Sequence, residues 1–258
     1  MGKNFVILSI GDIVGQEAVD YISARFGALR KEHCADMIIV NAENAAEGNG
    51  LDRATAETLL ASGADVLTTG NHVWQKRDLR SYLDDNRNIL RPANYRPELP
   101  GRGWGIYDFS GKRVLVMNLM GTVYLDPLAC PFSTVDAILE KEKGNYDISV
   151  LDFHAEATSE KIAMAYYLDG RVSAVYGTHT HVQTSDARVF PKGTGFITDL
   201  GMTGPLESVL GVRSECIIEK LKYHIPVRFE TAKGNIVIHG AKFTIDADSG
   251  KTVDVTAI

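Results

Sequence analysis

The feature that most constrains the fold is a repeated alternation of short, continuous apolar runs with segments of helical length. Seven runs rich in Val and Ile recur along the chain, at residues 5–10, 37–41, 65–69, 113–119, 147–153, 172–176 and 195–200. Such unbroken runs are typical of strands covered on both faces, because a strand with one face in water alternates apolar and polar residues. Helices are predicted between them, at residues 16–31, 53–62, 74–85, 134–143, 159–169 and 207–222. The pattern predicts an α/β fold whose sheet is at least partly parallel.

Two regions depart from this alternation. Residues 102–119 predict a β-hairpin that turns at Ser110-Gly111, and residues 226–257 predict a C-terminal β-meander with Gly-containing turns. No segment between the predicted elements has the composition of a linker, so we predict a single domain over residues 1–258.

Charge and cysteine content narrow the class of function. The chain has 258 residues and a formal net charge of −6, which gives no indication of a basic nucleic-acid surface. Cys34, Cys130 and Cys216 are too widely spaced for a disulfide framework or a thiolate zinc site, so we expect ordinary buried residues in a reducing compartment. The first apolar run is too short for a signal sequence or a membrane span, and we expect a cytoplasmic protein without membrane contact.

Side chains that can bind metals follow five of the apolar runs. They are carboxylates, carboxamides and imidazoles: Asp12, Glu43, Asn44, Asn71, His72, His154, His179 and His181. The C-terminal ends of parallel strands share one edge of a sheet, where α/β folds bind ligands, so we expect these eight side chains to converge. Each alone is more often a turn or core residue; the five loops together indicate a site. The remaining histidines are interpreted as structural, at a helix end (His33), before a turn (His224) and in a strand (His239).

These motifs resemble those of the calcineurin-like metallophosphoesterases. The strings GDIVG, NAENAAEGNGL, TTGNHVW, DFHAEATSEK, GTHTHVQT and TDLGMTGP are similar to one branch, the bacterial 2',3'-cyclic-nucleotide 2'-phosphodiesterases, over nearly the whole chain. Two positions depart from the wider superfamily: Val14 stands in place of a histidine, and Glu43-Asn44 stands where a bridging aspartate is usual. The branch shares both departures.

The resemblance implies a fold and a metal site. The fold would be a four-layer sandwich of two packed mixed β-sheets flanked by helices, with the C-terminal meander completing the second sheet. A dinuclear site would lie at the C-terminal ends of the strands. The first ion would be held by Asp12, Glu43, Asn44 and His181. The second would be held by Glu43, Asn71, His154 and His179, with Glu43 bridging. Oxygen and imidazole ligands without thiolate suit two ions of iron, which is the first choice, or of manganese or zinc.

The resemblance also implies a reaction, the hydrolysis of 2',3'-cyclic nucleotides to 3'-nucleotides. A hydroxide bridging the cations would attack phosphorus, and His72 would be the catalytic proton donor. The residues leave three alternatives open: the same chemistry on 3',5'-cyclic nucleotides, another phosphoester as substrate, or a metal-dependent regulatory protein with weak catalysis. No motif identifies the substrate-binding residues, although the loop at 201–205 is a candidate. Aromatic residues within 102–132 predict either a homo-oligomer contact or packing of the hairpin on its own domain.

Overall fold

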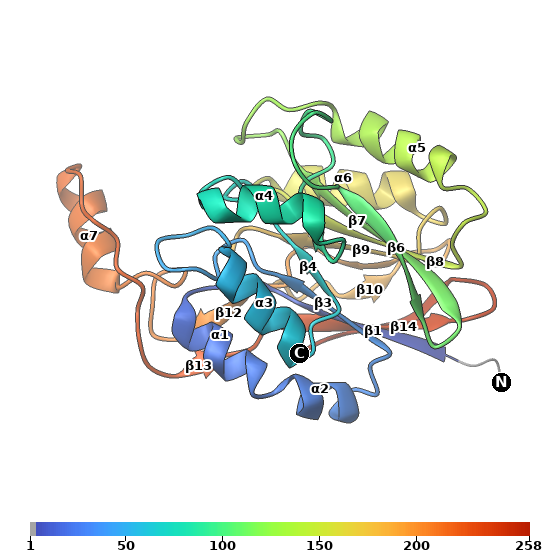
Figure 1. Cartoon of the computed structure of the whole chain (residues 1–258), viewed down its shortest axis with the longest axis horizontal. Coiled ribbons are helices and arrows are strands. Elements are labelled where there is room, and N and C mark those ends of the chain that lie inside the picture. The colour runs from blue at the N-terminus through green and yellow to red at the C-terminus, as the bar shows by residue number, and fades with distance from the viewer. Residues whose placement is uncertain (1–3) are drawn as a thin grey trace.

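The computed structural model describes residues 4–258, and its centre is a pair of six-stranded mixed sheets packed face to face (Figure 1). The strand order of the first sheet is β15 (Thr252–Ala257), β14 (Gly240–Asp246), β1 (Asn4–Ile10), β3 (Met37–Asn41), β4 (Val66–Thr68) and β5 (Ile89–Leu90). Its last four strands are parallel, whereas β14 is antiparallel to both β1 and β15.

The second sheet repeats this mixed arrangement. Its order is β10 (Arg188–Val189), β11 (Gly195–Ile197), β9 (Ala174–Thr178), β8 (Ile148–His154), β7 (Lys112–Met120) and β6 (Trp104–Phe109). The four inner strands are parallel and the two edge strands are antiparallel to their neighbours. A small third sheet joins β13 (Ile236–Val237), β12 (Met202–Pro205) and β2 (Asp12–Ile13).

Helices cover the outer face of each large sheet. The first is covered by α1 (Gln16–Ser23), α2 (Phe26–Glu32), α3 (Arg53–Ser62) and α4 (Arg77–Asp85), and the second by α5 (Pro131–Lys141) and α6 (Thr158–Leu168). Along β1, Phe5 and Ile7 face the other sheet while Leu8 and Ile10 face the helices. The apolar runs are continuous because both faces are buried. The expected mixed α/β fold with mixed sheets is confirmed.

Two of the predicted helices depart most from the structure. The segment 16–31 is two helices, because the chain leaves α1 at Ala24, and Arg25 donates from Nη1 to the Tyr21 carbonyl (2.9 Å). Within 207–222, only α7 (Ser214–Tyr223) is helical, since Leu210 and Gly211 adopt positive φ angles of 54° and 93°. A left-handed residue cannot continue a right-handed helix.

Three further expectations were wrong. The C-terminal strands β14 and β15 extend the first sheet rather than the second, because β14 pairs with the free edge of β1. His239 lies in the connection between β13 and β14, not in a strand. The cysteines are not buried: Cys34 and Cys130 are exposed and Cys216 is half-buried. Among residues 4–258, no helix is long and apolar enough to cross a membrane.

Candidate metal centre

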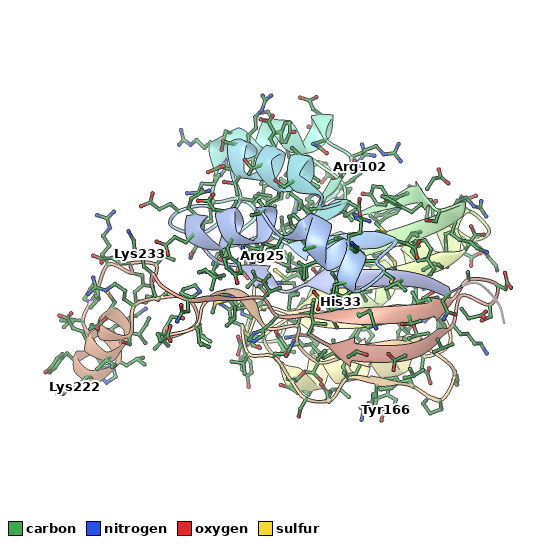
Figure 2. All side chains as sticks on the ribbon, turned by 90° about the horizontal axis from the view of Figure 1, so that it is seen from below. Arg25, His33, Arg102, Tyr166, Lys222 and Lys233 are labelled. Atoms are coloured by element: carbon green, nitrogen blue, oxygen red, sulfur yellow. The ribbon has the colours of Figure 1, made fainter. Side chains whose placement is uncertain are left out.

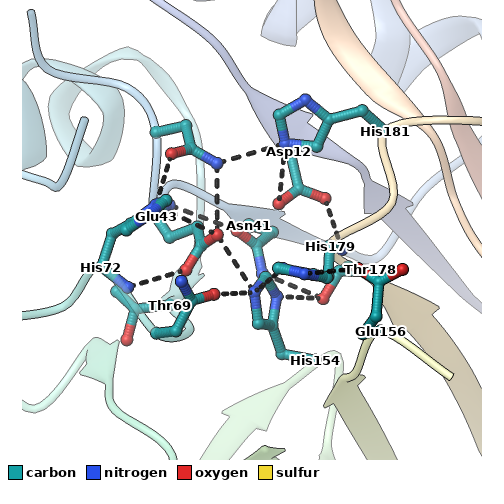
Figure 3. Close-up of polar contacts among 12 residues, drawn as sticks. Asp12, Asn41, Glu43, Thr69, His72, His154, Glu156, Thr178, His179 and His181 are labelled. Atoms are coloured by element: carbon teal, nitrogen blue, oxygen red, sulfur yellow. Dashed lines mark hydrogen bonds and ion pairs between the residues drawn. The ribbon is translucent and has the colours of Figure 1, made fainter. Parts of the chain in front are cut away.

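The structure brings the eight predicted side chains together where the C-terminal ends of both large sheets meet. Figure 3 shows the carboxylates and histidines among them, namely Asp12, Glu43, His72, His154, His179 and His181. From the first sheet, Asp12 follows β1, Glu43 and Asn44 follow β3, and Asn71 and His72 follow β4. From the second sheet, His154 ends β8, and His179 and His181 follow β9. The sequence changes from apolar to polar side chains at each strand end because the apolar core ends there.

His154 is the centre of the first half of the cluster. Its Nε2 atom lies 3.0 Å from Glu43 Oε1, 3.0 Å from Asn71 Oδ1 and 3.1 Å from His179 Nδ1. Glu43 and His154 are fully buried, and their donor atoms and that of His179 all lie within 4.8 Å of one another. Three electron-pair donors therefore surround one ring nitrogen.

The other ring nitrogen of His154 fixes the tautomer. Nδ1 lies 2.8 Å from Thr178 Oγ1, and the Thr178 hydroxyl donates to Asp152 Oδ1 at 2.7 Å. Because the single proton of this hydroxyl is used in the hydrogen bond to Asp152, the hydroxyl accepts a hydrogen bond from Nδ1–H of His154. The proton of the neutral imidazole is therefore on Nδ1, and Nε2 has a lone pair. Four lone pairs then converge without a proton between them, which is the donor set of a cation site.

Gly70 makes this convergence possible. A Cβ atom at Gly70 would lie 2.3 Å from Glu43 Oε2 and 2.3 Å from His154 Nε2. The backbone must pass directly beside the donor atoms, and only glycine leaves them room.

The second half of the cluster contains a carboxylate oxygen without a partner. Asp12 is fully buried, and its Oδ1 has no hydrogen-bond partner among the described residues. His181 Nε2 lies 3.8 Å from this oxygen, and the Nδ1–H of His181 donates to the Leu210 carbonyl (3.0 Å). A buried, unpaired carboxylate oxygen facing an imidazole lone pair is costly without a cation, so these residues also fit a metal ion.

Asn44 connects the two halves and His72. Its amide nitrogen lies 3.2 Å from both Glu43 Oε1 and His181 Nε2, while its oxygen accepts from His72 Nδ1 (2.8 Å). Carboxamides bind cations through oxygen, so Asn44 is a ligand only if its amide is turned by half a rotation. His72 also donates its backbone N–H to Glu43 Oε2 (3.2 Å), and its side chain is 25% exposed at the rim.

The pKa values of the cluster show a site that attracts positive charge. Burial alone would lower the pKa of His154, but the Glu43 carboxylate beside it raises that pKa to about 9. Burial would raise the pKa of Glu43, yet His154 and His72 lower it to about 2. Burial raises the pKa of Asp12 to about 6, against the opposing effect of His181 and His154. Burial and the neighbouring His154 lower the pKa of His179 to about 3. Without a metal, a proton on His154 supplies the missing charge.

A cleft of about 1500 Å³ opens onto the cluster, a volume above the range of roughly 300–1,000 Å³ of typical ligand pockets. Its floor is formed by five residues of the cluster, namely Glu43, Asn44, His72, His179 and His181. One wall is the segment 205–233, which includes Arg228, Phe229 and Lys233. Of the predicted substrate loop 201–205, only Pro205 lines the cleft; the rest is mainly strand β12.

Several supporting residues were missed from the sequence. Asp152 lies behind His154 and accepts from Asn41 Nδ2 (3.1 Å) as well as from Thr178, and burial raises its pKa. Glu156 Oε2 lies 3.0 Å from His179 Nε2. A signal existed for Asp152: it is a charged residue inside an apolar run, two positions before His154, and in a strand such residues share a face.

Comparison with known proteins relates this arrangement to one family. The profile of the family described as YmdB-like protein matches residues 8–258. A 2',3'-cyclic-nucleotide 2'-phosphodiesterase of Bacillus subtilis is 43% identical over 252 residues, which is 98% of this chain and 96% of that protein. A solved structure of a novel phosphatase from Mycoplasma pneumoniae is 32% identical, with a TM-score of 0.94, over 100% of this chain and 94% of the other. That of a hypothetical protein from Thermus thermophilus is 37% identical, with a TM-score of 0.92, over 98% of both chains.

Proposed function

The chain belongs to the YmdB-like family, and from this premise we propose that it is a dinuclear-metal phosphodiesterase that hydrolyses 2',3'-cyclic nucleotides to 3'-nucleotides. The chain is a metal-dependent phosphoester hydrolase, because the relatives named above are a phosphodiesterase and a phosphatase. The specific substrate is taken from the relative with 43% identity.

One observation carries the proposal: the crowding of electron-pair donors around His154 Nε2. This ring nitrogen of the fully buried His154 has an oxygen or nitrogen atom about 3 Å away from each of Glu43, Asn71 and His179. A cation converts this arrangement from a repulsive one into a stable one, and a phosphoester anion is the natural substrate of a cationic centre.

The chain's own donors divide into two sets. One ion would be held by Asp12, Glu43, Asn44 and His181. The other ion would be held by Glu43, Asn71, His154 and His179, so that Glu43 is common to both sites. Iron is the first choice of metal, with manganese or zinc as alternatives, because no thiolate is present. When bound, two such ions supply an acidified water as nucleophile and positive charge for the phosphoryl oxygens.

His72 would donate the proton that the leaving 2'-oxygen requires. Among the described residues, its ring makes a hydrogen bond only through Nδ1, to Asn44, so Nε2 is available to a substrate. Its partial exposure at the cleft floor is suited to that task, whereas the fully buried His154 has no route to a leaving group.

The size of the cleft favours a second candidate, the same chemistry on a larger phosphoester. The volume of about 1500 Å³ exceeds the roughly 300–1,000 Å³ of typical small-ligand pockets. The chain would act as a single domain of residues 1–258, in the cytoplasm, where its three free cysteines would persist as thiols.

The test measures metal content and product identity together. Metal-loaded protein is incubated with 2',3'-cyclic AMP, 3',5'-cyclic AMP and bis-p-nitrophenyl phosphate, and the products are separated by chromatography. We expect two ions per chain and 3'-AMP from the first substrate. His154→Ala should bind fewer ions and lose activity. If the protein binds two ions but hydrolyses no phosphoester, the catalytic proposal is wrong and a regulatory metalloprotein remains. If the product is 2'-AMP, the proposed cleavage of the bond to the 2'-oxygen is wrong.

A further inference from the structure

The loop that carries two of the proposed ligands is strained. His179 and His181 have φ angles of 104° and 64°, in the left-handed region that side chains other than glycine rarely adopt. Such a backbone conformation is strained and persists only where the surrounding structure enforces it. Thr180 lies between them, and its hydrogen bonds join the loop to Asp199.

Thr180 is held by a buried carboxylate. Asp199 Oδ2 accepts from the Thr180 backbone N–H (3.2 Å) and from the Thr180 hydroxyl (2.7 Å). Asp199 Oδ1 accepts from the Gly201 N–H (2.8 Å), which fixes the carboxylate in its plane. Asp199 is only 1% exposed, so these bonds form away from water.

A buried lysine from a different element neutralises this carboxylate. Lys161, on α6, is 1% exposed and places Nζ 2.7 Å from Asp199 Oδ2. Its stem passes against Gly177, where a Cβ atom would lie 2.7 Å from Lys161 Cδ. The glycine of the motif GTHTH therefore leaves space for the lysine to reach the carboxylate.

Fold stability alone does not explain this pair. Lysine is almost never fully buried, and replacing a buried ion pair with apolar residues of similar volume is often neutral or stabilising. Here the Lys161 ammonium compensates the charge of the carboxylate that accepts both hydrogen bonds from Thr180. Such charge-assisted hydrogen bonds are about twice as strong as neutral ones.

We propose that Lys161 and Asp199 form a positioning pair that holds Thr180, and through it keeps His179 and His181 in the strained geometry that binds metal. Neither residue touches substrate. The inference rests on the proposed function, since it assumes that the two histidines are ligands.

The experiment compares two double variants, Lys161→Met/Asp199→Asn and Arg30→Met/Asp65→Asn. Each removes both charges of one ion pair, so no unpaired charge is left buried. The Arg30–Asp65 pair is the control, because Asp65 also accepts a backbone N–H, from Ile38, but precedes β4 at the opposite edge of the sheet.

Affinity is measured with Co²⁺ alone, by chelator competition, together with the visible absorption spectrum of the bound ion. Loss of a supporting partner of a metal ligand typically costs 10–100-fold in affinity. We expect a loss of about that size and an altered spectrum for Lys161→Met/Asp199→Asn. The control variant should keep the affinity and spectrum of the original chain.

Wild-type affinity and spectrum in Lys161→Met/Asp199→Asn would overturn the inference, as would equal losses in the two double variants. If the first double variant does not fold, Thr180→Val and Thr180→Ser decide the question: valine should weaken Co²⁺ binding and serine should restore it, and equal binding by both would refute the role. Tight Co²⁺ binding without phosphoester hydrolysis would defeat the proposed function and leave this inference standing. No Co²⁺ binding by the original chain would defeat both.

Discussion

The metal cluster and the arm, which we define as residues 206–235, are opposites in how they are held. In the cluster, Asp12, Glu43 and His154 are fully buried, and each is surrounded by side chains from other loops. In the arm, α7 has no buried residue, and Ile218 and Leu221 are 58% and 65% exposed. Figure 2 shows the arm, with Lys222 and Lys233, standing away from the body of the molecule.

The two regions nevertheless meet. The Leu210 carbonyl of the arm orients His181, and residues 205–233 form a wall of the cleft. The two sides of the arm are joined to each other by the Arg213–Glu230 ion pair (2.7 Å) and by the bridge of Val212 to Thr231. The buried cluster is therefore held by contacts from several loops, whereas the exposed arm contributes one orienting carbonyl and one wall of the cleft.

The largest effect is expected from Gly70→Ala, which tests whether the cluster tolerates any change. A methyl group 2.3 Å from Glu43 Oε2 and His154 Nε2 would displace both, so the variant should lose metal and retain no more than ~0.01% of the activity, a loss at the upper end of what removing one catalytic group causes. Elemental analysis and the phosphodiesterase assay measure this. Gly27→Ala is the control, since nothing lies within 4 Å of its added Cβ. Normal metal content in Gly70→Ala would show that the cluster is adaptable after all.

The next effect separates chemistry from metal binding at the rim of the cluster. His72→Ala should keep both ions while turnover of a 2',3'-cyclic nucleotide falls by ~10²–10⁴-fold, the usual contribution of general acid catalysis. The loss should be smaller for a nitrophenyl phosphodiester, because a phenolate leaves without protonation. His33→Ala, at the end of α2, is the matched control. Equal losses on both substrates would assign His72 to binding, and loss of an ion would make it a ligand.

A pH effect is expected only in the metal-free cluster. The pKa of His154 is raised from 6.5 to about 9 by Glu43, so the folded chain holds a proton that the unfolded chain releases. This contribution to stability is complete below about pH 6.5 and is lost as the pH rises through about 9. Thermal midpoints in a chelator should therefore fall across that window. Excess Mn²⁺ should abolish the fall, because bound metal replaces the proton. If the thermal midpoint of the metal-free protein does not change with pH across this window, the raised pKa of His154 is contradicted.

The smallest effect is expected in the arm. Leu221→Ser removes an exposed apolar side chain, so the free energy of unfolding should change by no more than about 0.5 kcal/mol, with metal content unchanged. Leu67→Ala, in buried β4, should cost about 2–5 kcal/mol in the same denaturation series. A large loss in Leu221→Ser, or a change of mass in light scattering, would show that the arm is covered in a homo-oligomer.

Sequence patterns predicted the strands well and the helix boundaries less well. Continuous runs such as 37–41 correspond closely to strands because burial on both faces leaves a clear signal. The break at Ala24 within 16–31 left no such signal, since the apolar stripe of Val19, Ile22 and Phe26 continues across it. The exposed cysteines and the attachment of β14 to β1 were also beyond what local patterns contain.

The sequence by itself determined which residues gather at the site, because each follows a buried strand and parallel strands end at a common edge. Glu43, His154 and His179 could be named as neighbours on that basis. Tertiary structure alone decided how they are held: the hydroxyl of Thr178 that fixes the His154 tautomer, the Lys161–Asp199 pair behind Thr180, and the Leu210 carbonyl on His181. These contacts join segments separated by 24 to 38 residues. Strand periodicity reports only whether a residue is buried, and the partner of a buried polar group is set by packing between elements.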